Sequence, residues 1–316
     1  NFRQTPFSQK HRVNVDYYIS NNGYDIGYLG EYANIFNRMN VQFGIKFTSP
    51  NYTTNFFGFG NESENIEESL AFNRVKLEQF KTSLGVVKHG VQGSELNWNL
   101  SYESNRIENT TNRYIGQSVL EESLFDRKNF VGTDFLYQFK NYDDSAYPTL
   151  GLNVQFEMGW KLNTSDTKQN FGYLIPSISF IHYLSNDKRW VLANKTKTHI
   201  MLNDNFEFYQ GATLGAKDGL RGYRFQRFTG NSVFYNSSDI RFQIKRLRTG
   251  IAPVNFGLYS GFDIGRAWLS TEKSKKWHNS IGGGLWLKVA DMATAQLGVF
   301  NSAEDTRVSF GFGFGI

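Results

Sequence analysis

The chain has 316 residues with 30 Gly, 5 Pro and no Cys, and its formal net charge is +5. Aromatic residues make up 16% of the sequence, which excludes a disordered chain, because such chains have few aromatic residues and a high net charge. The lack of Cys excludes a disulfide scaffold. No apolar run approaches the ~18 residues that a membrane-spanning helix needs, so a helical membrane protein is excluded too.

The strongest pattern along the chain is a strict alternation of apolar and polar residues, which is typical of β-strands. Between Leu150 and Leu162, every second residue is apolar and the intervening residues are polar or glycine. In all, we predict about fourteen strands, many of them longer than the usual ~5–6 residues. The clearest segments are 13–19, 39–47, 96–102, 135–139, 150–162, 240–244, 256–264, 281–289 and 308–316.

Alternation gives each strand one apolar face but does not say what that face meets. A soluble sandwich turns its apolar face inward, so this alternative stays open from the pattern alone. Long strands favour a transmembrane barrel, whose tilted strands need about 9–11 residues for the apolar zone and whose apolar face points outward to lipid. The predicted fold class is therefore all-β, a transmembrane antiparallel β-barrel.

The connections between the predicted strands alternate between short and long. Barrels of the outer membrane have this rhythm, with short turns at one rim and long loops at the other, and it places the C-terminus at the short-turn rim. The turn at 21–25 is an exception, because a long loop is expected there. Short connections are predicted at 37–39, 88–94, 145–149, 185–188, 248–253 and 291–293, and long ones at 49–70, 106–128, 202–231 and 270–278.

The longest connection contains the sequence Asp218-Gly-Leu-Arg-Gly-Tyr223, and Gly261-Phe-Asp-Ile-Gly265 follows two strands later. The first resembles the (Val/Ile/Leu)-Arg-Gly-(Phe/Tyr) signature in the sixth extracellular loop of BamA-like outer-membrane insertases and translocases, the bacterial surface antigen barrels. The second resembles the aromatic-x-Asp-x-Gly strand motif of the same family.

The resemblance implies that loop 203–231 folds into the lumen and that Arg221 contacts Asp263. The resemblance also makes Gly222, Tyr223 and Gly265 part of the two motifs that carry this pair. Strand parity agrees with the transfer, because an outward Phe262 turns Asp263 inward. The same parity turns Asp239 inward, where it could share Arg221. The plain alternative is an exposed Arg221 and a hydrated Asp263.

The last residues resemble the recognition signal of the final strand in outer-membrane barrels. Gly311, Phe314 and Ile316 take the glycine and hydrophobic positions of that signal. The sequence departs from it at the end, since the usual last residue is aromatic and Ile316 is not.

The family usually has sixteen strands preceded by soluble periplasmic domains. The expected organisation is therefore a lead-in at residues 1–10 and a barrel at 11–316, with two strands and a periplasmic or catalytic domain missing upstream. Segment 51–61 resembles segments of barrels that follow a catalytic domain such as a metallophosphoesterase. The plain alternative is that this segment is an aromatic loop that packs on itself.

By resemblance, the expected function is insertion, assembly or translocation of proteins at the bacterial outer membrane, with the C-terminus on the periplasmic side. The expected partners are membrane lipid, lipopolysaccharide, client polypeptides and partner lipoproteins. Lys273, Lys275 and Lys276 form a basic loop tip that either contacts lipopolysaccharide or is simply solvated. Two alternatives stay open: a passive porin, and a membrane anchor for an upstream enzyme.

We expect no catalysis, no metal and no cofactor in this chain. Its five His residues lack the spacing of metal ligands, and no G-x-S-x-G nucleophile elbow is present. The run Gly282–Gly284 lies in a strand with no following helix, so it is not a phosphate-binding loop. The small basic excess, 34 Lys and Arg against 29 Asp and Glu, does not predict nucleic-acid binding.

Overall fold

The computed structural model describes residues 9–18, 22–36, 39–66, 69, 71–117, 122–248, 250, 252–290 and 293–314. In this part of the chain, fourteen strands pair in succession, each antiparallel to the next. They are β1 (Gln9–Tyr18), β2 (Gly23–Phe36), β3 (Met39–Thr48), β5 (Arg74–His89), β6 (Ser94–Ile107), β7 (Lys128–Tyr142), β8 (Gly151–Asn163), β9 (Phe171–Tyr183), β10 (Trp190–Met201), β13 (Ser232–Arg248), β14 (Pro253–Trp268), β15 (His278–Val289), β16 (Ala293–Ser302) and β17 (Thr306–Phe314).

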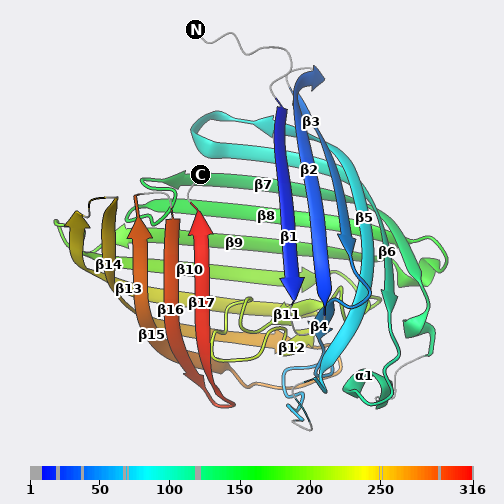
Figure 1. Cartoon of the computed structure of the whole chain (residues 1–316). Coiled ribbons are helices and arrows are strands. Elements are labelled where there is room, and N and C mark those ends of the chain that lie inside the picture. The colour runs from blue at the N-terminus through cyan, green and yellow to red at the C-terminus, as the bar shows by residue number, and fades with distance from the viewer. Residues whose placement is uncertain are drawn as a thin grey trace.

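The sheet curls round an interior (Figure 1). Among the described residues, no backbone pairing joins β1 to β17, so both strands have one free edge. The predicted all-β antiparallel barrel and its strand number are confirmed. Strand β1 begins at Gln9, so residues 9 and 10 belong to the sheet rather than to the expected lead-in, and residues 1–8 lie outside the described part.

The few other elements are short. Strand β4 (Thr53–Asn55) adds to one end of β5, and β11 (Ala212–Leu214) pairs with β12 (Phe228–Gly230). The helices of the described residues are α1 (Tyr114–Gln117) and three 3₁₀ turns, η1 (Val91–Gly93), η2 (Glu122–Phe125) and η3 (Thr167–Gln169). None of the helices in the described residues is long and apolar enough to cross a membrane.

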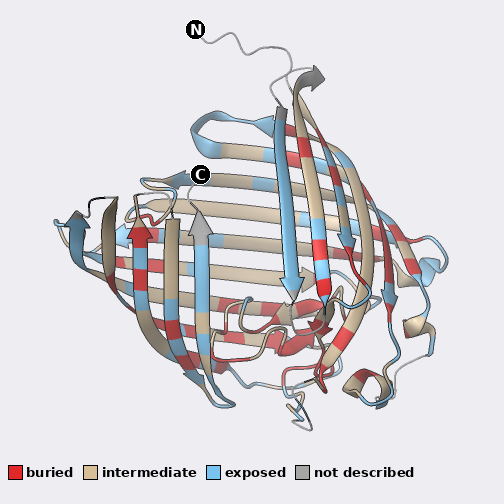
Figure 2. Cartoon of the chain, in the orientation of Figure 1, coloured by how far each residue is buried: buried red, intermediate tan, exposed pale blue. Residues whose placement is uncertain are grey.

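The apolar face of the sheet points outward. On β6, the side chains of Trp98 and Leu100 are 49% and 56% exposed, whereas the alternate residues Asn97 and Ser101 are each 7% exposed. Figure 2 shows the same alternation of exposed and buried bands along several strands. A soluble sandwich would have the opposite arrangement, so that alternative is excluded.

The described residues of the four long connections lie at one end of the sheet, which we call the long-loop end; these connections run over 49–73, 108–127, 202–231 and 269–277. The short connections, among them 90–93, 143–150 and 184–189, lie at the other, short-turn end, where β17 also ends. The antiparallel strand order fixes this distribution.

The connection 202–231 turns back into the interior. Figure 1 shows β11 and β12 inside the curve of the sheet. Leu214, Leu220 and Phe228 of this loop pack in one buried cluster with Phe130 of β7 and Tyr235 of β13. Because these rings and methyl groups are removed from water, the loop has an apolar anchor that holds it against the wall.

Candidate functional site

The motif Arg221-Gly222-Tyr223 lies between β11 and β12, in a tight turn of the inserted loop. Leu220 N–H donates a hydrogen bond to Gly215 O at 2.8 Å, and Tyr223 N–H donates to Leu220 O at 3.1 Å. The side chains of Leu220 and Tyr223 are 0% and 1% exposed. These two buried residues flank Arg221 and fix its backbone beside the sheet.

The wall opposite Arg221 presents one small polar side chain from each of three adjacent strands. Ser237 of β13 is the cross-strand partner of Asp263 of β14, which in turn is the partner of Ser280 of β15. Partners on neighbouring strands lie side by side on the same face of the sheet. Asp263 and Ser280 are both 0% exposed, so these two side chains are sealed from solvent, whereas Ser237 is half-buried.

Arg221 and Asp263 form the centre of the site. The backbone N–H of Arg221 donates to Asp263 Oδ2 at 3.0 Å, its Nε donates to Oδ2 at 3.0 Å, and its Nη2 donates to Oδ1 at 2.7 Å. The hydroxyls of Ser237 and Ser280 donate to the same carboxylate at 2.6 and 2.8 Å. A planar guanidinium fits a carboxylate in this two-pronged way, and the serines satisfy its remaining acceptor sites.

Two further groups complete the surroundings of Arg221. Its Nη2 lies 2.8 Å from Asp239 Oδ1, and its Cζ lies 4.0 Å from the centre of the Phe300 ring on β16. Burial alone would lower the pKa of Arg221, but its hydrogen bond to Asp263 and the charges of Asp239 and Asp263 raise that pKa above the ordinary value. The guanidinium thus stays charged and contacts β13, β14 and β16, while Ser280 of β15 bonds to the same Asp263 carboxylate; we call this set of contacts the arginine clamp.

Glycines make room for the clamp. A Cβ atom on Gly261, which precedes Asp263 on the same face, would lie 2.5 Å from Arg221 Nη2. A Cβ on Gly222 would lie 2.8 Å from Ser280 Cβ, and one on Gly265 would lie 2.9 Å from Leu214 Cδ1. The Asp-x-Gly spacing therefore places an acidic partner and an open backbone on one inward face.

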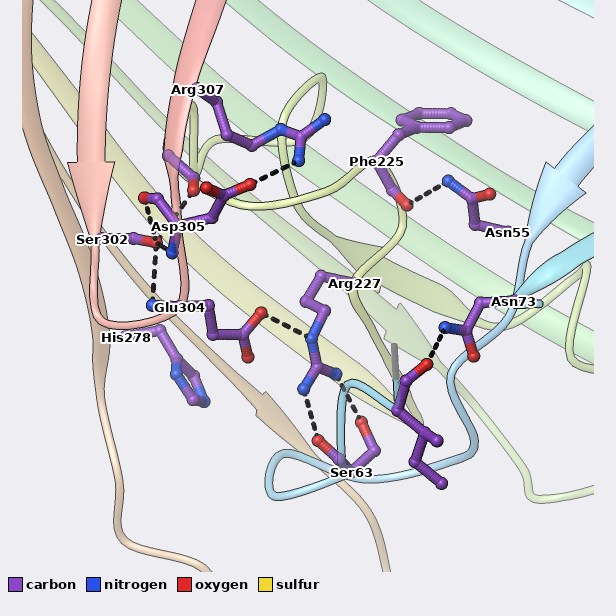
Figure 3. A network of polar contacts seen from close by, with 12 residues as sticks. Asn55, Ser63, Asn73, Phe225, Arg227, His278, Ser302, Glu304, Asp305 and Arg307 are labelled. Carbon is purple, nitrogen blue, oxygen red and sulfur yellow. Dashed lines mark hydrogen bonds and ion pairs between the residues drawn. The ribbon is translucent and has the colours of Figure 1, made fainter. Parts of the chain in front are cut away.

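A second set of contacts ties the inserted loop to other loops at the long-loop end (Figure 3). Arg227, which is 2% exposed, donates from Nε to Glu304 Oε2 at 2.8 Å and from Nη1 to Ser63 Oγ at 3.0 Å. Asn55 Nδ2 donates to Phe225 O at 2.9 Å. Residues 55–63 therefore pack against the inserted loop rather than only on themselves.

Asn61 extends this loop-to-loop contact. Its side chain donates to Lys276 O at 2.9 Å and accepts from Ala267 N–H at 2.9 Å. Its backbone N–H donates to Glu272 Oε2 at 2.6 Å. One asparagine thereby fastens connection 49–73 to connection 269–277, a role that nothing in its local sequence indicates.

The connection 143–150 at the short-turn end also enters the interior. Tyr147, 8% exposed, stacks on Trp286 of β15 with 4.4 Å between ring centres. The guanidinium of Arg241 on β13 lies 4.5 Å from the centre of the Tyr147 ring. Asp144 Oδ2 and Lys288 Nζ form an ion pair at 2.5 Å. The connection between β7 and β8 thus contacts β13 and β15, which are far from it in the strand order, so this connection and the inserted loop both enter the interior.

The remaining predicted site residues lie in or beyond β17. Gly311 is in that strand, and a Cβ there would meet only Gln296 Cβ, at 3.9 Å. Phe314 ends the strand, but its side chain, like the whole of Ile316, lies outside the described residues. In the described ranges, no group of three or more His, Cys, Asp or Glu side chains is placed to hold a metal ion.

Comparison with known proteins establishes the fold. No family model matches the sequence, and no curated protein matches it. The structure resembles BamA from Haemophilus ducreyi lacking POTRA domains 1–3, with a TM-score of 0.68, 13% identity and coverage of 97% of this chain and 69% of that one. It also resembles CdiB from Escherichia coli, with a TM-score of 0.63, 10% identity and coverage of 97% and 56%. The BamA-like fold that the two motifs predicted is confirmed.

Proposed function

We propose that this chain is the barrel domain of an outer-membrane protein that inserts or translocates polypeptides. The observation that carries the proposal is the arginine clamp, in which Arg221 of the inserted loop meets Asp263 of the wall. A BamA-like fold could be used for other purposes. The clamp supports this one because it joins the two motifs that the sequence shares with insertases and translocases.

The outward apolar face supports the membrane location. Leu100, Trp160, Leu258 and Phe262 all point outward and are 42–56% exposed. Such a belt is unfavourable in water and favourable in hydrocarbon. The proposed orientation places the short-turn end and the end of β17 at the periplasm, and the long-loop end outside the cell.

The proposed mechanism involves no chemical step and no cofactor. In the described part of the chain, β17 pairs with β16 alone, and its outward residues Val308 and Phe310 are 72% and 70% exposed. The free backbone groups of such an edge can template an incoming strand by β-augmentation. Client polypeptides, partner lipoproteins and lipopolysaccharide are the partners that this proposal implies.

A passive porin is the second candidate, and the interior contacts argue against it. A porin needs a water-filled passage, whereas here loop 202–231 and connection 143–150 both enter the lumen and are fixed there by buried contacts. The anchor hypothesis, in which the barrel only holds an upstream enzyme at the membrane, stays a prediction that the sequence before Asn1 would test.

The experiment is the substitution Arg221→Ala in the full-length protein, reconstituted in lipid vesicles. An insertase should lose most of its ability to accelerate the folding of an unfolded barrel client, because the loop is no longer held on the wall. The matched control is Lys217→Ala in the same loop. The Nζ of Lys217 lies 5.2 Å from the centre of the Phe225 ring and takes no part in the arginine clamp. Gel mobility with and without heating reports whether each variant is folded.

Single-channel conductance distinguishes the two candidates. If Arg221→Ala leaves client folding at the wild-type rate and only raises conductance in a planar bilayer, the porin hypothesis is correct and the insertase hypothesis is wrong. An equal loss in Lys217→Ala would show that the clamp has no special part in the activity.

A further inference from the structure

The interior contains a cavity of about 330 Å³ beside the arginine clamp. Its walls come from β9, β10 and β13, from residues 216–221 of the inserted loop, and from Tyr142 at the end of β7. It therefore lies where the inserted loop approaches the base of connection 143–150. Neither the clamp nor the proposed insertion activity requires this space.

The charges around the cavity are unbalanced. Lys195, Lys217, Arg221 and Arg241 line it, and the sole carboxylate in its lining is Asp239. Asp239 pairs with Arg221, whose charge is already met by Asp263. Three cations are left in the lining, and no ion pair within the described residues joins any of them to a carboxylate.

Asp218 is a further carboxylate that acts on these lysines, and it reduces the excess of positive charge without removing it. It lies outside the lining, accepts a hydrogen bond from the hydroxyl of Thr213 at 3.3 Å, and attracts Lys195, Lys197 and Lys217 together. One half-buried carboxylate thus lies among three ammonium groups, and Arg241 is not one of its partners.

Arg241 has a hydrogen-bond donor that the described residues do not satisfy. Its guanidinium stacks on Tyr147, and its Nη1 is a buried nitrogen with no hydrogen-bond partner in the described part of the chain. A buried donor without a partner costs free energy, typically about 1–3 kcal/mol. Ser179 and Tyr142 add hydroxyl groups to the same lining.

We propose that this cavity binds a phosphate group. Phosphate carries a charge of about −1.5 to −2 at neutral pH and has several strong acceptor oxygens, which matches one guanidinium and two ammonium groups whose charge Asp218 offsets only in part. A singly charged anion would leave most of the excess uncompensated. The cavity is at the small end of ligand sites, which span about 300–1,000 Å³, so an organic group attached to the phosphate also fits. The phosphate comes either free from solution or as part of a lipid headgroup.

The test is calorimetric titration of the folded full-length protein in a non-ionic detergent. Inorganic phosphate is titrated first, and a short-chain phosphatidic acid is titrated in parallel. Saturable binding of phosphate is expected, and Lys195→Gln should weaken it about tenfold, the loss expected for one charge-assisted hydrogen bond. Lys195 is exposed to the lumen, so this substitution should leave the fold intact.

The matched control is Lys188→Gln in the short connection 184–189, where the lysine is 52% exposed and away from the cavity. Lys217→Gln is the second test variant, since Arg241→Gln also removes the stack on Tyr147. Tighter binding of phosphatidic acid than of phosphate, lost in the same variants, identifies a lipid headgroup as the source. No saturable binding of either probe, or equal weakening by Lys188→Gln and Lys195→Gln, would overturn the proposal.

Discussion

Replacing Asp263 with Asn tests the clamp most directly, because Asn has nearly the same size but no charge and one acceptor oxygen fewer. Asp263 is 0% exposed and accepts hydrogen bonds from Arg221 N, Nε and Nη2 and from the hydroxyls of Ser237 and Ser280. An amide nitrogen cannot accept any of these bonds, so one donor at least is left facing another donor.

The size of the effect follows from burial. Removing one partner of a buried ion pair costs about 3–5 kcal/mol, because the other charge is left uncompensated. Asp239 remains beside Arg221 at 2.8 Å and offsets part of that loss. We therefore expect the free energy of unfolding to fall by about 3 kcal/mol in Asp263→Asn. Asp239→Asn should cost about 1 kcal/mol, since Asp239 makes a single contact with the guanidinium and is 18% exposed.

Urea titration of the protein folded in lipid vesicles measures both values, with tryptophan fluorescence and gel mobility as the two probes. Asp305→Asn serves as the control, because this aspartate lies in the β16–β17 connection with a side chain that is 49% exposed. Equal losses in Asp263→Asn and Asp239→Asn, or a loss below about 1 kcal/mol in the former, would refute the claim that the clamp is a buried, fully bonded pair.

Two other predictions concern the outward face and the connection 143–150. Phe156→Arg should lower the free energy of unfolding in lipid by about 2–4 kcal/mol while the inward Gln155→Arg stays nearly neutral, and equal effects in a urea titration would contradict the assigned facing. The partial burial of Asp144 would raise its pKa, but hydrogen bonds from Lys288 and the N–H groups of Tyr147 and Ala146 lower the pKa below its ordinary value. This carboxylate stabilises the fold at neutral pH, and the contribution is lost as the pH falls through the lowered pKa. Asp144→Asn should therefore flatten the acid end of a stability-versus-pH curve, and an unchanged acid limb would show that the ion pair adds nothing.

The sequence predicted most of the fold because each strand repeats one simple physical pattern. In 150–162 the parity of the side chains alone tells which of them turn outward, and the structure agrees at Trp160 and Lys161, 42% and 3% exposed. The placement of Arg221 opposite Asp263 was also within reach, because family motifs and strand parity both pointed to it. Ser237 and Ser280 were missed, although their inward parity and cross-strand register with Asp263 are the signal that could have found them.

The interior contacts of the connections could not have been read from the sequence. Tyr147 lies in an eight-residue connection, 143–150, that has no periodicity and was expected to be a simple turn. Its partner Trp286 is far away in the chain, and only the curvature of the sheet brings the two rings together. The same holds for Asn61 and Arg227, whose hydrogen bonds reach residues more than 70 positions away.

The inserted loop is fastened to the last hairpin as well as to the wall. Ser302, at the end of β16, donates to Gly222 O at 2.8 Å, and Glu304, in the connection to β17, receives Arg227. A swing of β16 and β17 away from β15 would therefore pull on the turn that carries Arg221. The free strand edge and the outer mouth of the barrel are in this way mechanically linked, so that force applied at one is transmitted to the other.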